Sequence, residues 1–341
     1  MSTSFNAAAR LREMAGGYRA SQMVLLAVRL KLADHLADRP RSADDLAALT
    51  GVLRDPLYRV LRGMVGLGLL EEAVDGRFQL TDLAQPLRSD HPESVVSSVL
   101  FTASIENTRA WAELEHTLHT GVSGFEHAFG MPRFEHLRAH PEQMTIFQSQ
   151  MTLQMQQVAR AVVAAYDFSA AHTVADLGGG RGHLLATILG AHANLRGVLF
   201  DIPETVAVAE ESLRRAGILE RCRLEGGDFF QSVPDDADLY ILSWILHDWS
   251  DDQVMRILRN CSRSIRPGSR LLVIERVLPE RAEPSDPVRG AFLGDIHMLA
   301  LLTGRERTLS EFTDLLSASG FHLERVIPTD SPRTILETYK V

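Results

Sequence analysis

An alternation of short apolar runs and helical stretches, which starts at His172, constrains the fold most strongly. The runs are rich in β-branched residues, and helical stretches such as 183–192 and 204–217 separate most of them. A strand buried on both faces reads as a continuous apolar run, so this pattern predicts a parallel sheet with helices on both faces. Residues 321–328 and 333–340 close the chain as two adjacent strands, which predicts an antiparallel hairpin at the sheet edge.

The N-terminal part reads as helices followed by one small ribbon. Apolar residues at three- and four-residue steps predict a helix over Ser21–Leu36. Ser42 is the predicted N-cap of the next helix, and Asp55 that of a third, with Pro56 at its first position. Gly76 lies between two short extended runs and predicts a hairpin. Helices followed by a ribbon are the layout of a winged helix.

These patterns divide the chain into three parts, at 1–90, 91–170 and 171–341. The middle part reads as helical, with prolines as breaks, and its last helix carries an apolar stripe at helical spacing formed by Met144, Phe147, Met151 and Met155. The stripe has two readings, which are packing in the core and contact with a ligand.

Bulk composition excludes several classes of protein. The net charge of −9 disfavours a nucleic-acid partner held by general electrostatics. No run of 18 apolar residues occurs, so no membrane span is predicted, and the N-terminus does not read as a secretory signal. Cys222 and Cys261 have no metal-binding spacing, and two free thiols fit a reducing cytoplasm.

A glycine-rich turn follows the first strand of the predicted sheet. Its glycines at Gly178, Gly180 and Gly182 let the backbone approach a ligand closely, and the helix after them offers free N–H groups. Dinucleotide-binding enzymes place a glycine at the position that His183 occupies here. The spacing therefore favours a methyltransferase over a dehydrogenase, although a tight structural turn remains an alternative.

Acidic residues follow the next two strands. Asp201 ends the second strand, where an acid can accept hydrogen bonds from both ribose hydroxyls of a nucleoside. Asp228 follows the third strand and could accept an adenine amino group, while Phe229 could pack on the ring. The alternatives are a helix cap at Asp201 and an ordinary turn residue at Asp228.

His247 lies just past the end of the fourth strand, on the side of the sheet that binds ligands in such folds. A histidine is the natural base for a hydroxyl proton near neutral pH. Most of the 13 histidines are expected to be structural, and His247 is distinguished by its place beside the predicted cofactor site.

At these residues the sequence resembles a known family. The segments VADLGGGRGHLL, VLFDIP, GDFF, LHDWSDD and GDIHMLALLTGRERTLSEF, with the N-terminal winged helix, are similar to the small-molecule O-methyltransferases of bacteria and plants that include caffeic acid O-methyltransferase. The resemblance covers residues 10–341. It implies a C-terminal Rossmann-like sheet of seven strands, a mostly helical N-terminal dimerisation domain, and a cytoplasmic homodimer that modifies natural products such as antibiotics.

The resemblance also implies roles for single residues. His247 would be the catalytic base, flanked by Glu275 and Glu306. Residues that would bind S-adenosylmethionine, or its product S-adenosylhomocysteine, are Gly178, Gly180, Asp201, Asp228, Phe229 and Ser243. Residues that would contact a small aromatic substrate are Phe147, Met151, Trp244 and Met298. No metal is expected. Ser243 departs from the lysine of many plant members, and Thr303-Gly304 from their glycine pair.

Other functions stay open at this point. A winged helix could read DNA, but the first hundred residues carry twelve basic and twelve acidic residues and offer no basic face. N-methylation, or another tailoring reaction on the same scaffold such as hydroxylation, is compatible with the motifs. Either glutamate could instead form a surface ion pair with Arg276, Arg305 or Arg307.

Overall fold

The computed structural model describes residues 6–341, apart from the side chains of 286 and 287, and divides into two compact units. The first unit contains the residues up to Thr108 together with His140–Gln150. The second contains Arg109–Ala139 and Met151–Val341. None of the helices in residues 6–341 is long and apolar enough to cross a membrane.

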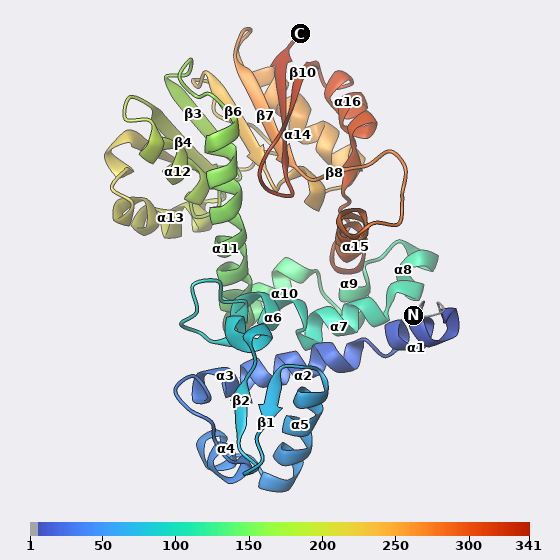
Figure 1. Cartoon of the computed structure of the whole chain (residues 1–341). Coiled ribbons are helices and arrows are strands. Elements are labelled where there is room, and N and C mark those ends of the chain that lie inside the picture. Colours follow the sequence, from blue (N-terminus) through green and yellow to red (C-terminus); the bar gives the residue numbers. More distant parts are fainter. Residues whose placement is uncertain (1–5) are drawn as a thin grey trace, which may run out of the picture. The chain divides into compact units, whose positions relative to one another are not determined.

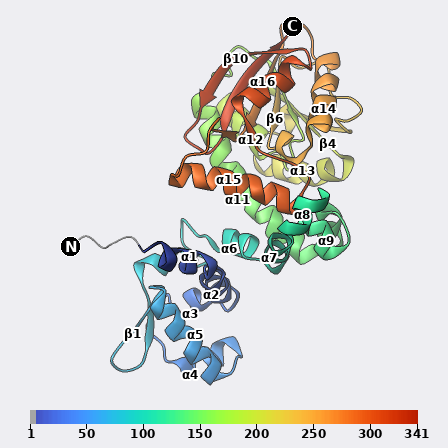
Figure 2. The same cartoon turned by 90° about the vertical axis from the view of Figure 1, so that its right-hand side faces the viewer.

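The first unit is built from helices and one ribbon (Figure 2). Its elements are α1 (Ala7–Ala15), α2 (Tyr18–Arg29), α3 (Leu32–His35), α4 (Ala43–Thr50), α5 (Arg54–Gly66), β1 (Leu70–Glu72), β2 (Phe78–Leu80), the 3₁₀ helix η1 (Asp82–Leu87) and α6 (Val96–Thr102). The antiparallel ribbon β1–β2 turns at Gly76, as predicted. Apolar side chains of these helices and the ribbon form the core, with Leu46, Leu61 and Phe78 fully buried.

Two details of this unit differ from the prediction. The helix expected over Ser21–Leu36 is broken after α2, because Lys31 adopts a left-handed conformation with φ of 51°. The third helix starts two residues earlier than expected, so Leu53 is its N-cap and Asp55 lies in the first turn. Proline is tolerated throughout that turn because its N–H groups have no partner within the helix. Ser42 caps α4 as predicted.

A run of helices connects the two units. It comprises α7 (Ile105–Ala112), α8 (Leu114–Thr120), α9 (Gly124–Phe129), α10 (Arg133–Ala139) and the long α11 (Pro141–Ala165). The C-terminal half of α11 buries Val158, Ala159 and Val162 in the core of the second unit.

The second unit is a seven-stranded mixed sheet with helices on both faces (Figure 1), which confirms the predicted fold class. Its elements are β3 (Thr173–Leu177), α12 (His183–Ala191), β4 (Arg196–Asp201), α13 (Pro203–Arg215), η2 (Leu219–Arg221), β5 (Cys222–Gly226), β6 (Leu239–Ser243), η3 (Leu246–Asp248), α14 (Asp251–Ser264), β7 (Arg270–Glu275), α15 (Asp286–Leu301), α16 (Leu309–Ser317), β10 (Phe321–Pro328) and β11 (Thr334–Lys340).

The strand order is β10-β11-β7-β6-β3-β4-β5. The five strands from β5 to β7 are parallel, and β10–β11 form the predicted antiparallel hairpin at one edge. One core layer packs α11, α12 and α13 on the sheet, and the other packs α14 and α16 on the opposite face. Strands β4, β6 and β7 have buried interiors, and the polar residues Asp201, Ser243 and Glu275 stand at their carboxyl ends.

A second, very small sheet positions the loop that follows α15. Strand β8 (Val277–Leu278) pairs in parallel with β9 (Arg307–Thr308), and the register places Val277 opposite Arg307. Glu275 ends β7 two residues before β8, and Glu306 directly precedes β9. The pairing therefore brings two glutamates together that are far apart in the sequence.

Candidate active site

The predicted cofactor residues lie where β3, β4, β5 and β6 end, at one edge of the parallel sheet. The turn after β3 holds Gly178 and Gly180 in left-handed conformations, with φ of 73° and 57°. A Cβ atom at Gly178 would lie 2.5 Å from Cδ1 of Ile245, so no larger residue fits there without a shift. At Gly180 an added Cβ would meet no atom within 4 Å, so the turn borders open space at that glycine.

Asp201 contacts this turn directly. Its Oδ2 accepts a hydrogen bond of 2.8 Å from the backbone N–H of Gly180, and its Oδ1 accepts one from Ile202. Ile202, not Asp201, is the N-cap of α13, so the alternative of a helix cap does not hold. Binding of a ribose by Asp201 stays a prediction, and the structure brings the acid and the glycine turn together.

Asp228 and Phe229 follow β5. Both carboxylate oxygens of Asp228 accept hydrogen bonds within the turn, from the N–H of Phe230 at 2.8 Å and from the amide of Gln231 at 3.1 Å. Phe229 packs edge-on against Phe230 and lies near Trp249, with ring centroids 5.0 and 6.2 Å away. Asp228 is therefore a turn residue in this structure, and its contact with adenine stays a prediction.

Several buried polar atoms at this edge have no hydrogen-bond partner within residues 6–341. Among them are Oγ of Ser243, at the end of β6, and Oδ2 of Asp176, on β3. An unsatisfied buried polar atom costs about 1–3 kcal/mol unless a ligand or water pairs with it. Both atoms therefore fit a site that a polar ligand completes.

Ionisation of Asp176 is expected to make the stability of the fold depend on pH. Burial, with the nearby charge of Asp201, raises the pKa of this carboxyl to about 7. Because the folded-state pKa exceeds the unfolded value, the protonated carboxyl favours the folded state. This stabilisation is fully present below the ordinary carboxyl pKa and is lost as the pH rises through 7. The slope is at most about 1.4 kcal/mol per pH unit.

Replacing Asp176 by asparagine is expected to remove this loss of stability. Denaturant unfolding at pH 5, 6, 7 and 8 measures the free energy of unfolding of both proteins. The value for Asp176→Asn minus that for the native chain should rise between pH 5 and 7. The exposed Asp235→Asn is the control and should follow the native chain. A constant difference between native and Asp176→Asn protein at all four pH values would contradict the assignment.

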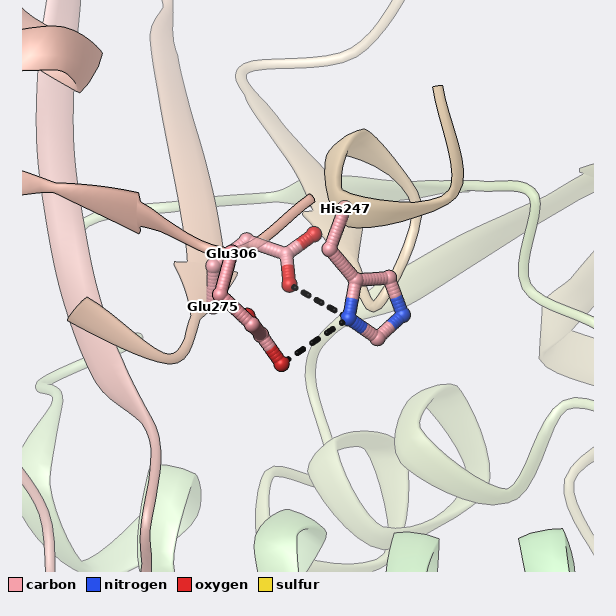
Figure 3. Close-up of side chains that lie close together, drawn as sticks. All are labelled: His247, Glu275 and Glu306. Carbon is pink, nitrogen blue, oxygen red and sulfur yellow. Dashed lines mark hydrogen bonds and ion pairs between the residues drawn. The ribbon is translucent and has the colours of Figure 1, made fainter. Parts of the chain in front are cut away.

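His247 lies in η3, the turn that follows β6, and is only 8% exposed. Its Nδ1 faces Oε1 of Glu306 at 3.4 Å and Oε2 of Glu275 at 3.8 Å (Figure 3). Both glutamates are buried, Glu306 at 3% exposure and Glu275 at 0%. Both carboxylates therefore meet Nδ1, whereas Nε2, on the other side of the ring, lies 3.6 Å from Oδ1 of Asp248.

The backbone around His247 is held from two sides. Oε1 of Glu275 accepts hydrogen bonds of 2.9 Å from the N–H groups of Ile245 and Leu246. The fully buried guanidinium of Arg307 donates to the carbonyl oxygens of Leu246, at 2.9 Å, and Trp249, at 2.8 Å. These contacts fix the turn on either side of the histidine.

The surface ion pairs considered from the sequence are absent among residues 6–341. Arg307 pairs with Asp251, Arg305 with Asp251 and Glu311, and Arg276 donates to the carbonyl of Gly290. The role of Arg307 was not predicted, because nothing in a sequence distinguishes a buried arginine from a surface one. Its place in the motif GRERT, beside Glu306, was the signal that could have identified it.

The glutamates change the proton affinity of His247. Burial by itself lowers the pKa of the imidazole, but the negative charges of Glu275, Asp248 and Glu306 outweigh that effect and raise the pKa to about 9. The imidazole is thus charged at neutral pH, whereas a base must be neutral before it accepts a proton. The pKa of this imidazole is therefore above the ordinary histidine value expected from the sequence.

Comparison with known proteins places this arrangement in a family. Residues 111–322 match the model of the O-methyltransferase domain, and residues 12–90 match the O-methyltransferase dimerisation domain. The chain belongs to the O-methyltransferase family. It is an S-adenosylmethionine-dependent methyltransferase, as the sequence predicted.

Similar proteins cover nearly the whole chain. Phenazine O-methyltransferase of Lysobacter antibioticus is 44% identical over 96% of this chain and 94% of its own length. The structure of mitomycin 7-O-methyltransferase is 35% identical, covers 98% of both chains and superposes with a TM-score of 0.92. An O-methyltransferase of neocarzinostatin biosynthesis, solved with S-adenosylmethionine and 2-hydroxy-5-methyl naphthoic acid, is 30% identical over 94% of this chain and 96% of its own, with a TM-score of 0.84. Other relatives are named as N-methyltransferases.

The candidate substrate residues of this methyltransferase lie in different parts of the molecule. Met151 on α11 and Met298 on α15 belong to the second unit and are partly exposed. Trp244, directly after β6, has its ring centroid 6.3 Å from that of His247. Phe147 belongs to the first unit, where its ring lies 6.1 Å from that of Phe101. The substrate contacts of all four stay predictions.

The histidine and its two glutamates could also be read as a metal site, because one ligand atom of each lies within 4.8 Å of the others. The guanidinium of Arg333 lies against this group, with Nη1 3.4 Å from Oε1 of Glu306. A fixed positive charge beside a ligand weakens the binding of a cation.

Proposed function

We propose that this methyltransferase transfers a methyl group from S-adenosylmethionine to a phenolic hydroxyl of a small aromatic natural product, with His247 as general base. The observation that carries the proposal is the buried His247 with two buried glutamates on one ring nitrogen, directly after β6. An acid behind a histidine orients the ring and stabilises its protonated form, as in serine hydrolases. Nε2 then faces the acceptor.

The cofactor residues fit a nucleoside with polar groups. The glycine turn borders open space at Gly180, Asp201 lies against that turn, and Oγ of Ser243 is buried without a partner among the described residues. When bound, S-adenosylmethionine supplies a methyl group on a positively charged sulfur, which is already activated for displacement. The chain therefore has to align the acceptor and take its proton.

Each of these residues has its own role in the proposed proton transfer. The acceptor oxygen gives its proton to Nε2 of His247 as it gains the methyl group. Glu306 and Glu275, on the Nδ1 side, stabilise the imidazolium that results. The same stabilisation makes the resting histidine harder to deprotonate, so the reaction should become faster as the pH rises toward 9.

A homodimer is part of the proposal. Residues 12–90 match a dimerisation domain. Leu11 and Met14 lie three residues apart on α1, and Tyr18 begins α2. They are 65%, 64% and 62% exposed, and a second copy could cover these apolar side chains.

A screen by mass spectrometry tests the reaction. The chain is incubated with S-adenosylmethionine and matched pairs of hydroxy and amino aromatics, including naphthoic acids, phenazines and quinones. A gain of one CH₂ on the hydroxy compounds supports the proposal. A gain only on the amino compounds would favour N-methylation, which needs no strong base, and an added oxygen would favour hydroxylation.

Cofactor binding gives a prediction for Asp201. If its carboxylate accepts hydrogen bonds from the ribose, Asp201→Ala should weaken binding of S-adenosylhomocysteine by about 2–4 kcal/mol. Isothermal calorimetry measures this loss, with the exposed Asp235→Ala as control. Equal affinity of the Asp201→Ala and native proteins would remove Asp201 from the cofactor site.

A further inference from the structure

Arg333 is buried at the tip of the C-terminal hairpin. It directly precedes β11, and only 7% of it is exposed. Its backbone is held within the turn, since its carbonyl oxygen accepts a 2.6 Å hydrogen bond from Oγ1 of Thr329 and its N–H donates to Oγ of Ser331 at 3.2 Å.

The guanidinium contacts two residues of the candidate active site. It lies over the ring of Trp244, 4.4 Å from the centroid, a distance typical of a cation–π contact. Its Nη1 lies 3.4 Å from Oε1 of Glu306, the oxygen that also faces Nδ1 of His247. Arg333 and His247 therefore share one carboxylate oxygen.

Trp244 needs such support. It is one of two residues other than glycine, within the described chain, that adopt a positive φ, here 59°. This conformation is costly for a bulky side chain and persists only when its surroundings hold it. The stacked guanidinium covers the ring of Trp244 on the segment that leads from β6 into the turn of His247.

Three acidic side chains lie close to the ring of His247. Glu275, Glu306 and Asp248 approach the imidazole from three separate elements, with Oδ1 of Asp248 at 3.6 Å from Nε2. Two further arginines act electrostatically on the acids, Arg133 on Asp248 and Arg276 on Glu306. Arg333 adds positive charge where Glu306 and His247 meet.

We propose that Arg333 is a positioning residue of this methyltransferase, which holds Glu306 and Trp244 in place and offsets the acids so that His247 can become neutral. The inference rests on the proposed role of His247 as a base. Loss of a neighbouring positive charge favours the charged imidazole and makes the neutral base rarer. Loss of the planar stack alone should loosen Trp244 but leave the proton equilibrium close to its original position.

Two substitutions separate charge from shape. Arg333→Gln removes the charge, and Arg333→Lys keeps it while losing the planar group. Arg325→Gln on the same hairpin is the control, because Arg325 pairs with Glu337 in a side-chain network separate from the histidine. The turnover number is measured from pH 6 to 10 with one acceptor, after melting curves establish that all variants fold.

A second measurement does not depend on turnover. The titration of His247 is followed by NMR in histidine-labelled protein without acceptor, and His247→Ala identifies its signal. Arg333→Gln should move both this titration and the rising limb of the pH profile upward by about one unit. Arg333→Lys should leave both within a few tenths of the native position, while its turnover falls severalfold.

Three outcomes would overturn the inference. An unchanged titration in Arg333→Gln would mean that its charge does not act on His247. Equal upward shifts in both variants, or a loss of turnover that is the same at every pH, would reduce Arg333 to a structural residue. If the native chain methylates no hydroxyl at all, the proposed function fails, while the titration still decides whether Arg333 acts on His247.

Discussion

Replacing His247 by alanine is expected to lower turnover by roughly 10²–10⁴, the usual effect of losing a positioned base. A phenol with a pKa near 10 is ionised in only about one molecule in a thousand at pH 7, so a proton acceptor is needed. Binding of S-adenosylhomocysteine should stay close to native, because the predicted cofactor residues lie at other strand ends. His172→Ala, with a side chain that is 94% exposed, is the control.

The raised pKa of His247 adds a second arm to this experiment. With a value of about 9, roughly one histidine in a hundred is neutral at pH 7. The kcat/KM of the native enzyme, which reports the free enzyme, should therefore rise about tenfold per pH unit and level off near pH 9. In His247→Ala the rise should instead follow ionisation of the acceptor, and a more acidic phenol should recover part of the lost rate.

The results that would contradict the assignment are specific. Native turnover in His247→Ala at pH 7 would mean that alignment alone carries the reaction. If turnover is lost and neither high pH nor an acidic phenol restores any, His247 positions the acceptor rather than taking its proton. A native profile that levels off near pH 6.5 would mean that the acids do not raise the pKa in solution.

The strands, and the residues at their ends, were predictable from the sequence. Strands buried on both faces leave uninterrupted apolar runs, so the first polar residue after each run marks the edge of the sheet. Asp201 was located in this way, and Ser243 lies at the predicted end of β6. Glu275, which the resemblance implied, also ends an apolar strand. The break at Lys31 could not be predicted, because the apolar periodicity continues through it.

The contacts among the active-site side chains were harder to predict. That Glu306 meets Glu275 depends on the pairing of β8 with β9, two strands of two residues each with no pattern of their own. The burial of Arg307 and Arg333 depends on which carbonyl, carboxylate or ring lies opposite, which is a property of the folded chain. In the sequence, both resemble the many surface arginines of this protein.

Gly304 offers a test of how strictly the turn of His247 must be placed. Gly304 lies in the loop between α15 and β9. A Cβ atom there would overlap the carbonyl oxygen of His247 and would approach C and Cα of Asp248 to 2.6 and 2.8 Å. All three are backbone atoms, which cannot rotate away as the end of a side chain can. An added methyl group therefore has to displace either its own loop or the turn that carries the base.

We expect Gly304→Ala to lower turnover by about 10²-fold, because displacement of a catalytic group by about 1 Å has an effect of that size. Overpacking should also cost about 1–3 kcal/mol of the free energy of unfolding, measured by denaturant titration.

Gly190→Ala on α12 is the matched control, since its added Cβ would meet no atom within 4 Å. Should Gly304→Ala unfold, turnover is compared in Thr303→Ala, which alters the same loop without adding a Cβ. Native turnover in a folded Gly304→Ala would show that the loop yields before the turn does, and that Glu275 and Arg307 alone fix the position of His247.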